Sequence, residues 1–250
     1  MHDPCYFAIR KADGKRVSIA DLSLDDRGLN CGCKCTFCQA DLQARMGTKN
    51  RWHFAHTSKG CDAEKVNMTG LYQLVYEYLA EKGSFPLPTV GLCFDLTYDS
   101  IHKRDIVPIT KSNASTRIQF RSPYPQNGKG KVFIETPKPW QLKSPEISYA
   151  STGLPNAIID TDSKQELALR IIPPKDVRKN VKAAAQDNYP TIILDLSGID
   201  IMDLSSQYLR ENIMSDPTFF YWIYYPKAKD LYPAIYKDSF AACAEKLNKL

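Results

Sequence analysis

The densest group of side chains able to bind a metal lies in the segment "CKCTFCQADLQARMGTKNRWHFAHTSKGC", residues 33–61. It holds four of the chain's eight cysteines and two of its four histidines. A Cys-x2-Cys turn directs two thiolates at one Zn²⁺, and a later His and Cys complete a tetrahedral set. The spacing Cys-x2-Cys-x17-His-x4-Cys therefore predicts a zinc site whose ligands are Cys35, Cys38, His56 and Cys61.

The spacing leaves some ligand positions open. Cys31 or Cys33 is an alternative to Cys35, and His53 is an alternative to His56. Cys35 is preferred because its partner in the Cys-x2-Cys turn supplies a second ligand at once. Four protein ligands leave no coordination position for water or substrate, so we expect the zinc to be structural and not catalytic.

Composition places the chain among ordinary globular proteins. Its 250 residues are 43% hydrophobic and 24% charged, with a formal net charge of +5. No run approaches the ~18 apolar residues of a membrane span, and the N-terminus lacks the apolar core of a signal peptide. We therefore expect a cytoplasmic protein, in which clustered cysteines favour metal binding over disulfides. The mild positive charge is compatible with nucleic acid.

The zinc segment must be held by flanking elements. Residues 5–22 predict two short strands around an Ala-Asp-Gly turn, and apolar residues at helical spacing predict a helix over 66–82. Further on, "ELALRII", a basic helix "KDVRKNVKAAAQD" and the apolar "TIILDLS" predict a parallel strand-helix-strand crossover. A capped helix at "SSQYLRENIM", an aromatic strand "FFYWIYYP" and a C-terminal helix complete an α/β chain with α+β character at its N-terminus.

The zinc segment, "LYQLVYEYL", "KRDIV" and "IILDLS" together resemble the competence protein CoiA-like family. The resemblance implies a small zinc-ribbon-like element followed by a restriction-endonuclease-like PD-(D/E)XK domain, a mixed sheet flanked by helices. Together with the sequence pattern, it divides the chain into a zinc element at 1–63, a nuclease-like core at 64–225 and a C-terminal helix at 226–250. The core contains an insertion at about 110–165 that is rich in loops, with short strands around "KVFIETP" and "NAIIDT".

Nucleases of this fold use carboxylates to bind Mg²⁺, which activates water and clamps the phosphate. Aligned with the family, Asp105 is kept, with Arg104 before it. The family's polar stripe on the helix is replaced by Met68, Tyr72 and Tyr76. The family's next carboxylate aligns with Arg170, which cannot bind Mg²⁺.

Two readings follow from that alignment. In the first, the nuclease site has been lost and the fold binds nucleic acid or a protein. In the second, Asp105 works with Glu135 or with Glu166 as an active Mg²⁺-dependent DNase.

The first reading is preferred because three positions of one helical stripe change together. It predicts DNA binding or an assembly role in DNA uptake, recombination, or phage and mobile-element defence. A protein-interaction module that does not bind DNA is a third possibility. The residues expected to contact nucleic acid are basic: Arg104, Arg170, Lys175, Arg178, Lys179 and Lys182.

Overall fold

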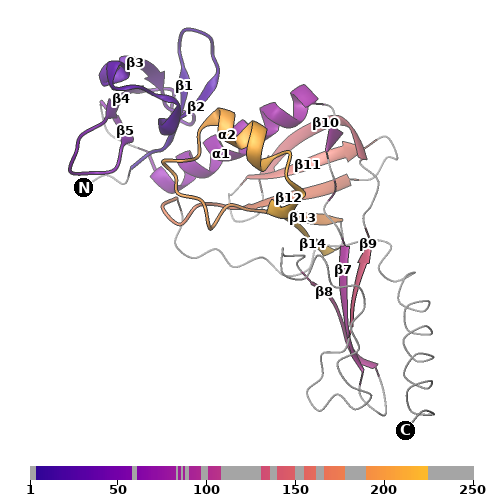
Figure 1. The fold of residues 1–250 in the computed structure, drawn as a ribbon. Helices are drawn as coiled ribbons and strands as arrows, with labels where there is room; N and C mark the ends of the chain where they lie inside the picture. The colour runs from indigo at the N-terminus through magenta and orange to yellow at the C-terminus, as the bar shows by residue number, and fades with distance from the viewer. Residues whose placement is uncertain are drawn as a thin grey trace, which may run out of the picture.

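The structure is a computed structural model of the whole chain, shown as a ribbon in Figure 1. It describes residues 4–57, 61–82, 84–85, 87, 90–96, 101–107, 131–135, 140–149, 155–161, 166–177 and 190–224. The predicted C-terminal helix at 226–250 and residues 178–187 of the predicted basic helix lie outside these ranges.

The N-terminal element is a five-stranded antiparallel sheet of order β2-β1-β3-β4-β5. The predicted strands around the Ala-Asp-Gly turn are confirmed as β1 and β2, and Gly14 closes the turn with a positive φ of 70° that favours glycine. Short 3-10 turns, η1 (Ile19–Asp21) and η2 (Leu24–Asp26), connect β2 to β3. The strands are β1 (Phe7–Arg10), β2 (Arg16–Ser18), β3 (Gly28–Lys34), β4 (Asp41–Arg45) and β5 (His53–His56).

One long helix, α1 (Ala63–Lys82), follows this element and confirms the helix predicted over 66–82. It contacts β1 and β2 on one side and β10 and β11 on the other, so it lies between the two parts of the molecule (Figure 1). Because α1 is covered on more than one side, its buried residues extend well beyond a single stripe and include the polar Asn67 and Thr69.

The larger sheet has six strands in the order β14-β13-β12-β11-β10-β6. The pair β12–β13 is parallel, as predicted, and the other pairs are antiparallel. Four of the five residues of β13 are buried, which fits a strand covered on both faces. The strands are β6 (Ser84–Phe85), β10 (Trp140–Tyr149), β11 (Pro155–Thr161), β12 (Glu166–Ile172), β13 (Thr191–Asp195) and β14 (Phe220–Tyr224).

The chain between β13 and β14 begins its helical part where it was predicted. Ser205 accepts a hydrogen bond from the Tyr208 backbone N–H and caps α2 (Ser206–Tyr208). The helix differs from the expected single helix, because after three residues it widens into a π-helical turn, η3 (Leu209–Ile213). A 3-10 turn, η4 (Pro217–Phe219), then leads into the predicted aromatic strand β14.

A separate three-stranded sheet has the order β8-β7-β9. Its strands are β7 (Val90–Leu96), β8 (Ile101–Val107) and β9 (Lys131–Glu135). With β10 and β11, β9 falls within the stretch 110–165 that the sequence suggested was rich in loops. The strands β9 and β11 coincide with the short strands expected around "KVFIETP" and "NAIIDT". The ten-residue β10 is longer than expected, and its irregular register between Leu142 and Pro145 explains why no clean alternation was visible.

The molecule therefore has mixed α/β content with mainly antiparallel sheets, which agrees with the predicted class. Buried residues of the N-terminal element, α1 and the six-stranded sheet form a single apolar cluster. No helix among the described residues is long and apolar enough to cross a membrane.

Polar contacts fix the N-terminal element on the rest of the chain. Asn67 of α1 accepts a hydrogen bond from the Tyr6 backbone N–H at 2.7 Å and donates to the Pro4 carbonyl at 3.0 Å. The Asp21 carboxylate accepts hydrogen bonds from Ser206, 185 residues away in the chain. The Cys/His-rich segment is thus held in a defined position relative to α1 and the larger sheet.

Candidate functional site

The four predicted zinc ligands lie together. The sulfur atoms of Cys35, Cys38 and Cys61 and a ring nitrogen of His56 are all within 4.8 Å of one another. Cys35 and Cys38 come from the turn that joins β3 to β4, His56 is the last residue of β5, and Cys61 lies two residues before the start of α1. The β4–β5 pairing, which places Leu42 opposite His56, brings the histidine to the end of the sheet that carries the turn.

Backbone hydrogen bonds shape the Cys-x2-Cys turn. The Cys35 N–H donates to the Ala40 carbonyl at 2.8 Å, and the Gln39 N–H donates to the Cys35 carbonyl at 3.2 Å. Gln39 has a φ of 63°, the only positive φ among the described residues other than glycine. The Phe37 N–H also donates to the Cys35 sulfur at 3.3 Å, a contact that stabilises a thiolate.

The electrostatics of the cluster favour a cation. Burial, with help from the neighbouring Cys38 and Cys35, raises the pKa of the Cys61 thiol to about 12, and burial also raises the pKa of Cys35. Burial opposes ionisation of Cys38 as well, but hydrogen bonds from Cys61 and from the Ala40 N–H leave its pKa lowered. Thiols this close resist a second ionisation, and a divalent cation between them removes that resistance.

The alternative ligands point to other partners. The Cys31 thiol donates to the Leu42 carbonyl at 3.4 Å, and the Cys33 thiol donates to the Cys31 carbonyl at 3.1 Å. The His53 ring lies 2.9 Å from the Arg51 carbonyl. Cys31 and Cys33 are buried in the sheet, so they act as core residues, and the cluster of Cys35, Cys38, His56 and Cys61 fits the tetrahedral donor set of a zinc ion.

The three candidate carboxylates for Mg²⁺ are spread over two sheets. Asp105 lies on β8 opposite Cys93 of β7, and Glu135 lies on β9 opposite Val90, which is also on β7. Glu166 begins β12 of the six-stranded sheet, opposite Asp160. The register pairs none of the three with another, and a shared Mg²⁺ site stays a prediction.

The predicted basic contacts are placed in part. Arg104 lies on β8 opposite Phe94, and Arg170 lies on β12 opposite Ile193. The Arg170 side chain is half-buried, whereas Lys175 is exposed in the turn that follows β12. Arg178, Lys179 and Lys182 lie outside the described residues.

The helix stripe that replaces the family's polar residues faces the protein interior. Met68 and Tyr72 are buried, and Tyr76 is half-buried. The Tyr72 hydroxyl accepts a hydrogen bond from the Ile171 backbone N–H at 2.9 Å, beside Arg170. The ladder between β11 and β12 ends at Leu169, so Ile171 needs an acceptor from elsewhere. Burial raises the pKa of Tyr72 to about 12, so this hydroxyl is neutral at physiological pH and has a structural role.

Tyr72→Phe is expected to cost about 1–3 kcal/mol of unfolding free energy, because it leaves the buried Ile171 N–H without an acceptor. A folded pKa of about 12 lies above the ordinary value near 10, so Tyr72 stabilises the fold fully below pH about 10 and ceases to do so as pH rises through about 12. Denaturant unfolding at pH 7 should show the lower stability of the variant. Between pH about 10 and about 12, the wild type should lose the stability that comes from Tyr72, and the variant should show no such decrease.

Tyr76→Phe is the matched control, since Tyr76 lies one turn further along the same stripe and makes no hydrogen bond within the described part of the chain. Equal stabilities for the two variants would contradict the role assigned to the Tyr72 hydroxyl.

Arg51 is a structural residue that local sequence signals did not reveal. Its guanidinium donates to Asp176 at 2.7 Å and to both carboxylate oxygens of Asp200 at 3.0 Å. These partners lie 125 and 149 residues away along the chain, so no periodicity or motif near Arg51 predicts them. The bidentate contact ties the β4–β5 connection to the loop after β13.

By its fold and cluster, this is a mixed α/β protein with an N-terminal Cys/His element that could hold a zinc ion. Residues 27–64 match the family model described as competence protein CoiA, N-terminal domain. The match contains all four cluster residues and ends just inside α1. A search of curated proteins and a search of solved structures each found no match.

Proposed function

We propose that the chain is a CoiA-like nucleic-acid-binding protein whose nuclease site is degenerate. It would act as a DNA-binding or assembly component in competence-related DNA uptake, in recombination, or in defence against phage and mobile elements. The observation that carries the proposal is the match of residues 27–64, which coincides with the cluster that could hold zinc. In this proposal a structural zinc completes the N-terminal element and leaves no open coordination position.

The rest of the chain would be a restriction-endonuclease-like core at 64–225 with the insertion at about 110–165, followed by the 226–250 segment. The sheet that follows α1 supports this layout, because it is mixed and contains the parallel pair β12–β13. A buried, neutral Tyr72 beside Arg170 supports loss of the metal site, because neither residue can bind Mg²⁺.

The test is binding and cleavage of duplex and single-stranded DNA over a range of salt concentrations. We expect no Mg²⁺-dependent cleavage and a binding constant that falls as salt rises. Arg170→Ala and Lys175→Ala should each weaken binding and lower the salt slope by about 1 if each contacts a phosphate. Asp105→Ala should leave binding unchanged.

Lys15→Ala is the control for charge, because Lys15 is an exposed lysine in the β1–β2 turn of the N-terminal element. Cleavage that requires Mg²⁺ and is abolished by Asp105→Ala would replace the proposal with an active nuclease using Asp105 and Glu135 or Glu166. Absence of any DNA binding, with a protein partner recovered instead, would favour the interaction module.

A further inference from the structure

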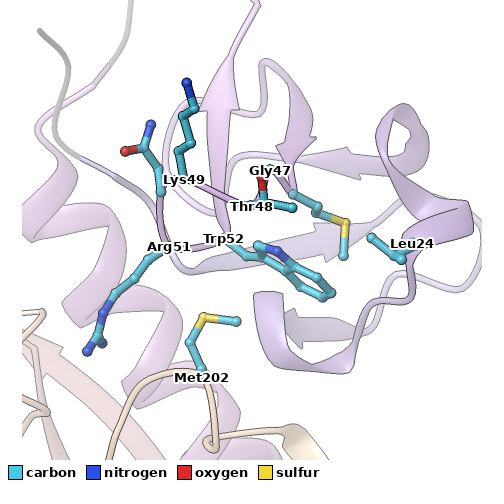
Figure 2. A pocket seen from close by; sticks show the side chains of 9 residues that line it. Leu24, Gly47, Thr48, Lys49, Arg51, Trp52 and Met202 are labelled. Atoms are coloured by element: carbon cyan, nitrogen blue, oxygen red, sulfur yellow. The ribbon is translucent and has the colours of Figure 1, made fainter.

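A pocket opens between the N-terminal element and the loop after β13. It has a volume of about 590 Å³, within the range of about 300–1,000 Å³ typical of small-ligand sites. Most of its lining comes from the β4–β5 connection, residues 46–52, with Leu24 of η2 and Met202 completing it. Figure 2 shows the Trp52 indole between Leu24 and Met202, which are far apart in the sequence.

Hydrogen bonds hold the two sides of this pocket together. Asp200 accepts from both terminal nitrogens of Arg51, and its Oδ1 also accepts the Met202 backbone N–H at 2.9 Å. One carboxylate thus fixes Met202 on one side relative to Arg51 on the other. Met46 is buried and Trp52 packs against the apolar core, so the floor of the pocket is held by packing. The pocket is therefore formed before any ligand arrives.

The lining suits a flat, negatively charged ligand. It offers an indole and two thioethers as an apolar surface, and it contains no carboxylate. The charge of Arg51 is balanced by Asp176 and Asp200. Lys49 is exposed, makes no ion pair within the described part of the chain, and extends away from the indole at the rim (Figure 2). In a nucleotide, the base could stack on the aromatic floor of the pocket while its phosphate lies outside, near the lysine at the rim.

We propose that this pocket binds one unstacked base of a single-stranded nucleic acid, with the base on the Trp52 indole and an adjoining phosphate near Lys49. The inference rests on the proposed nucleic-acid-binding function and adds to it a preference for single strands, because a paired base cannot enter the pocket. Stacking on an aromatic side chain tolerates any base, so the proposal predicts little sequence preference.

The experiment compares a short oligothymidylate with an abasic oligonucleotide of equal length, using tryptophan fluorescence and a separate binding assay. The thymidylate should quench the fluorescence and bind about tenfold or more tightly than the abasic strand. Trp52→Phe should remove the part of the quenching that arises at Trp52 and should weaken thymidylate binding severalfold. Trp222 is buried and should contribute little, and Trp140→Phe measures the share of the third tryptophan. Lys49→Ala should weaken binding of both oligonucleotides, whereas Lys15→Ala should change neither.

Thermal unfolding checks that Trp52→Phe is folded, and the exposed Lys49→Ala provides a second variant that does not disturb the core. Equal affinity for the two oligonucleotides, or unchanged thymidylate binding by both pocket variants, would overturn the inference. In that case, an apolar side chain of a protein partner would suit the Leu24, Met46 and Met202 lining better. Retained duplex binding would mean that only the pocket assignment had failed, whereas loss of all DNA binding would refute the proposed function as well.

Discussion

Cys38→Ser is expected to abolish stoichiometric zinc binding and to destabilise the N-terminal element by several kcal/mol. Structural zinc contributes about 10–16 kcal/mol of binding free energy in small zinc-dependent folds, and loss of one of four ligands forfeits a large share of it. Cys38 is exposed, so the substitution removes almost no core packing. Metal analysis of the purified protein and thermal unfolding, with and without a chelator, measure both effects.

Cys31→Ser is the matched control. Cys31 lies in the same element, is 5% exposed, and donates its thiol hydrogen to the Leu42 carbonyl, a bond that a serine hydroxyl can also make. If the four-residue cluster binds zinc, the exposed Cys38 should be the more costly residue to change. Without a metal, the order should reverse, because burying a hydroxyl in place of Cys31 would then outweigh an exposed substitution. The reversed order, with no zinc in the wild-type protein, would refute the site.

The metal cluster was predictable because its information is local. All four candidate ligands lie within residues 35–61, and the Cys-x2-Cys turn brings two of them together without help from the rest of the fold. Spacing could not decide between Cys35 and the nearby Cys31 or Cys33, since all three lie within five positions. The decision required the structure, in which Cys31 and Cys33 have carbonyl partners inside the sheet.

Strand prediction succeeded where the residues are apolar throughout, and it missed β10, where polar residues and a proline are mixed in. The run "TIILDLS" is apolar throughout, and β13 is accordingly buried in the sheet. By contrast, β10 contains Lys143 and Pro145 and has a break in its register, so its alternation was hidden although it spans ten residues. A bulge changes the face that each following side chain occupies, and a pattern search with a period of two cannot follow it.

Contacts between distant segments were the least predictable. Trp52 is partly buried and packs against the core, and the sequence around it indicated no role for it. Trp52 lines a pocket together with Met202, and Met202 is held there because Asp200 binds both its backbone N–H and Arg51. Nothing near either residue in the sequence indicates the other, because the contact arises only when the N-terminal element docks beside the six-stranded sheet.

Gly70→Ala is the second substitution with a large expected effect. It should lower the free energy of unfolding, whereas alanine in place of a helical glycine usually raises it. Alanine in place of glycine within a helix normally stabilises by about 0.5–1 kcal/mol. Here a Cβ at position 70 would overlap the Cβ of Phe7, a buried residue of β1. We expect a net loss of about 1–3 kcal/mol of unfolding free energy, measured by denaturant titration.

Gly198→Ala is the control, because a Cβ there meets no atom within 4 Å and the backbone has no positive φ. It should be neutral or stabilise by up to about 1 kcal/mol. A stabilising Gly70→Ala would mean that α1 does not approach β1 as the structure has it.

The clash at position 70 should also weaken zinc binding by the cluster of Cys35, Cys38, His56 and Cys61. It involves the Cβ of Phe7, which every residue except glycine carries, so changing Phe7 to another apolar residue cannot relieve it. Instead β1 must move away from α1, and β1 pairs Ile9 with Lys34, the residue before the candidate ligand Cys35. Gly70→Ala should therefore release zinc to a competing chelator faster than the wild type, whereas Gly198→Ala should not. Unchanged zinc release despite a large loss of stability would show that the Cys-x2-Cys turn is independent of the contact between α1 and β1.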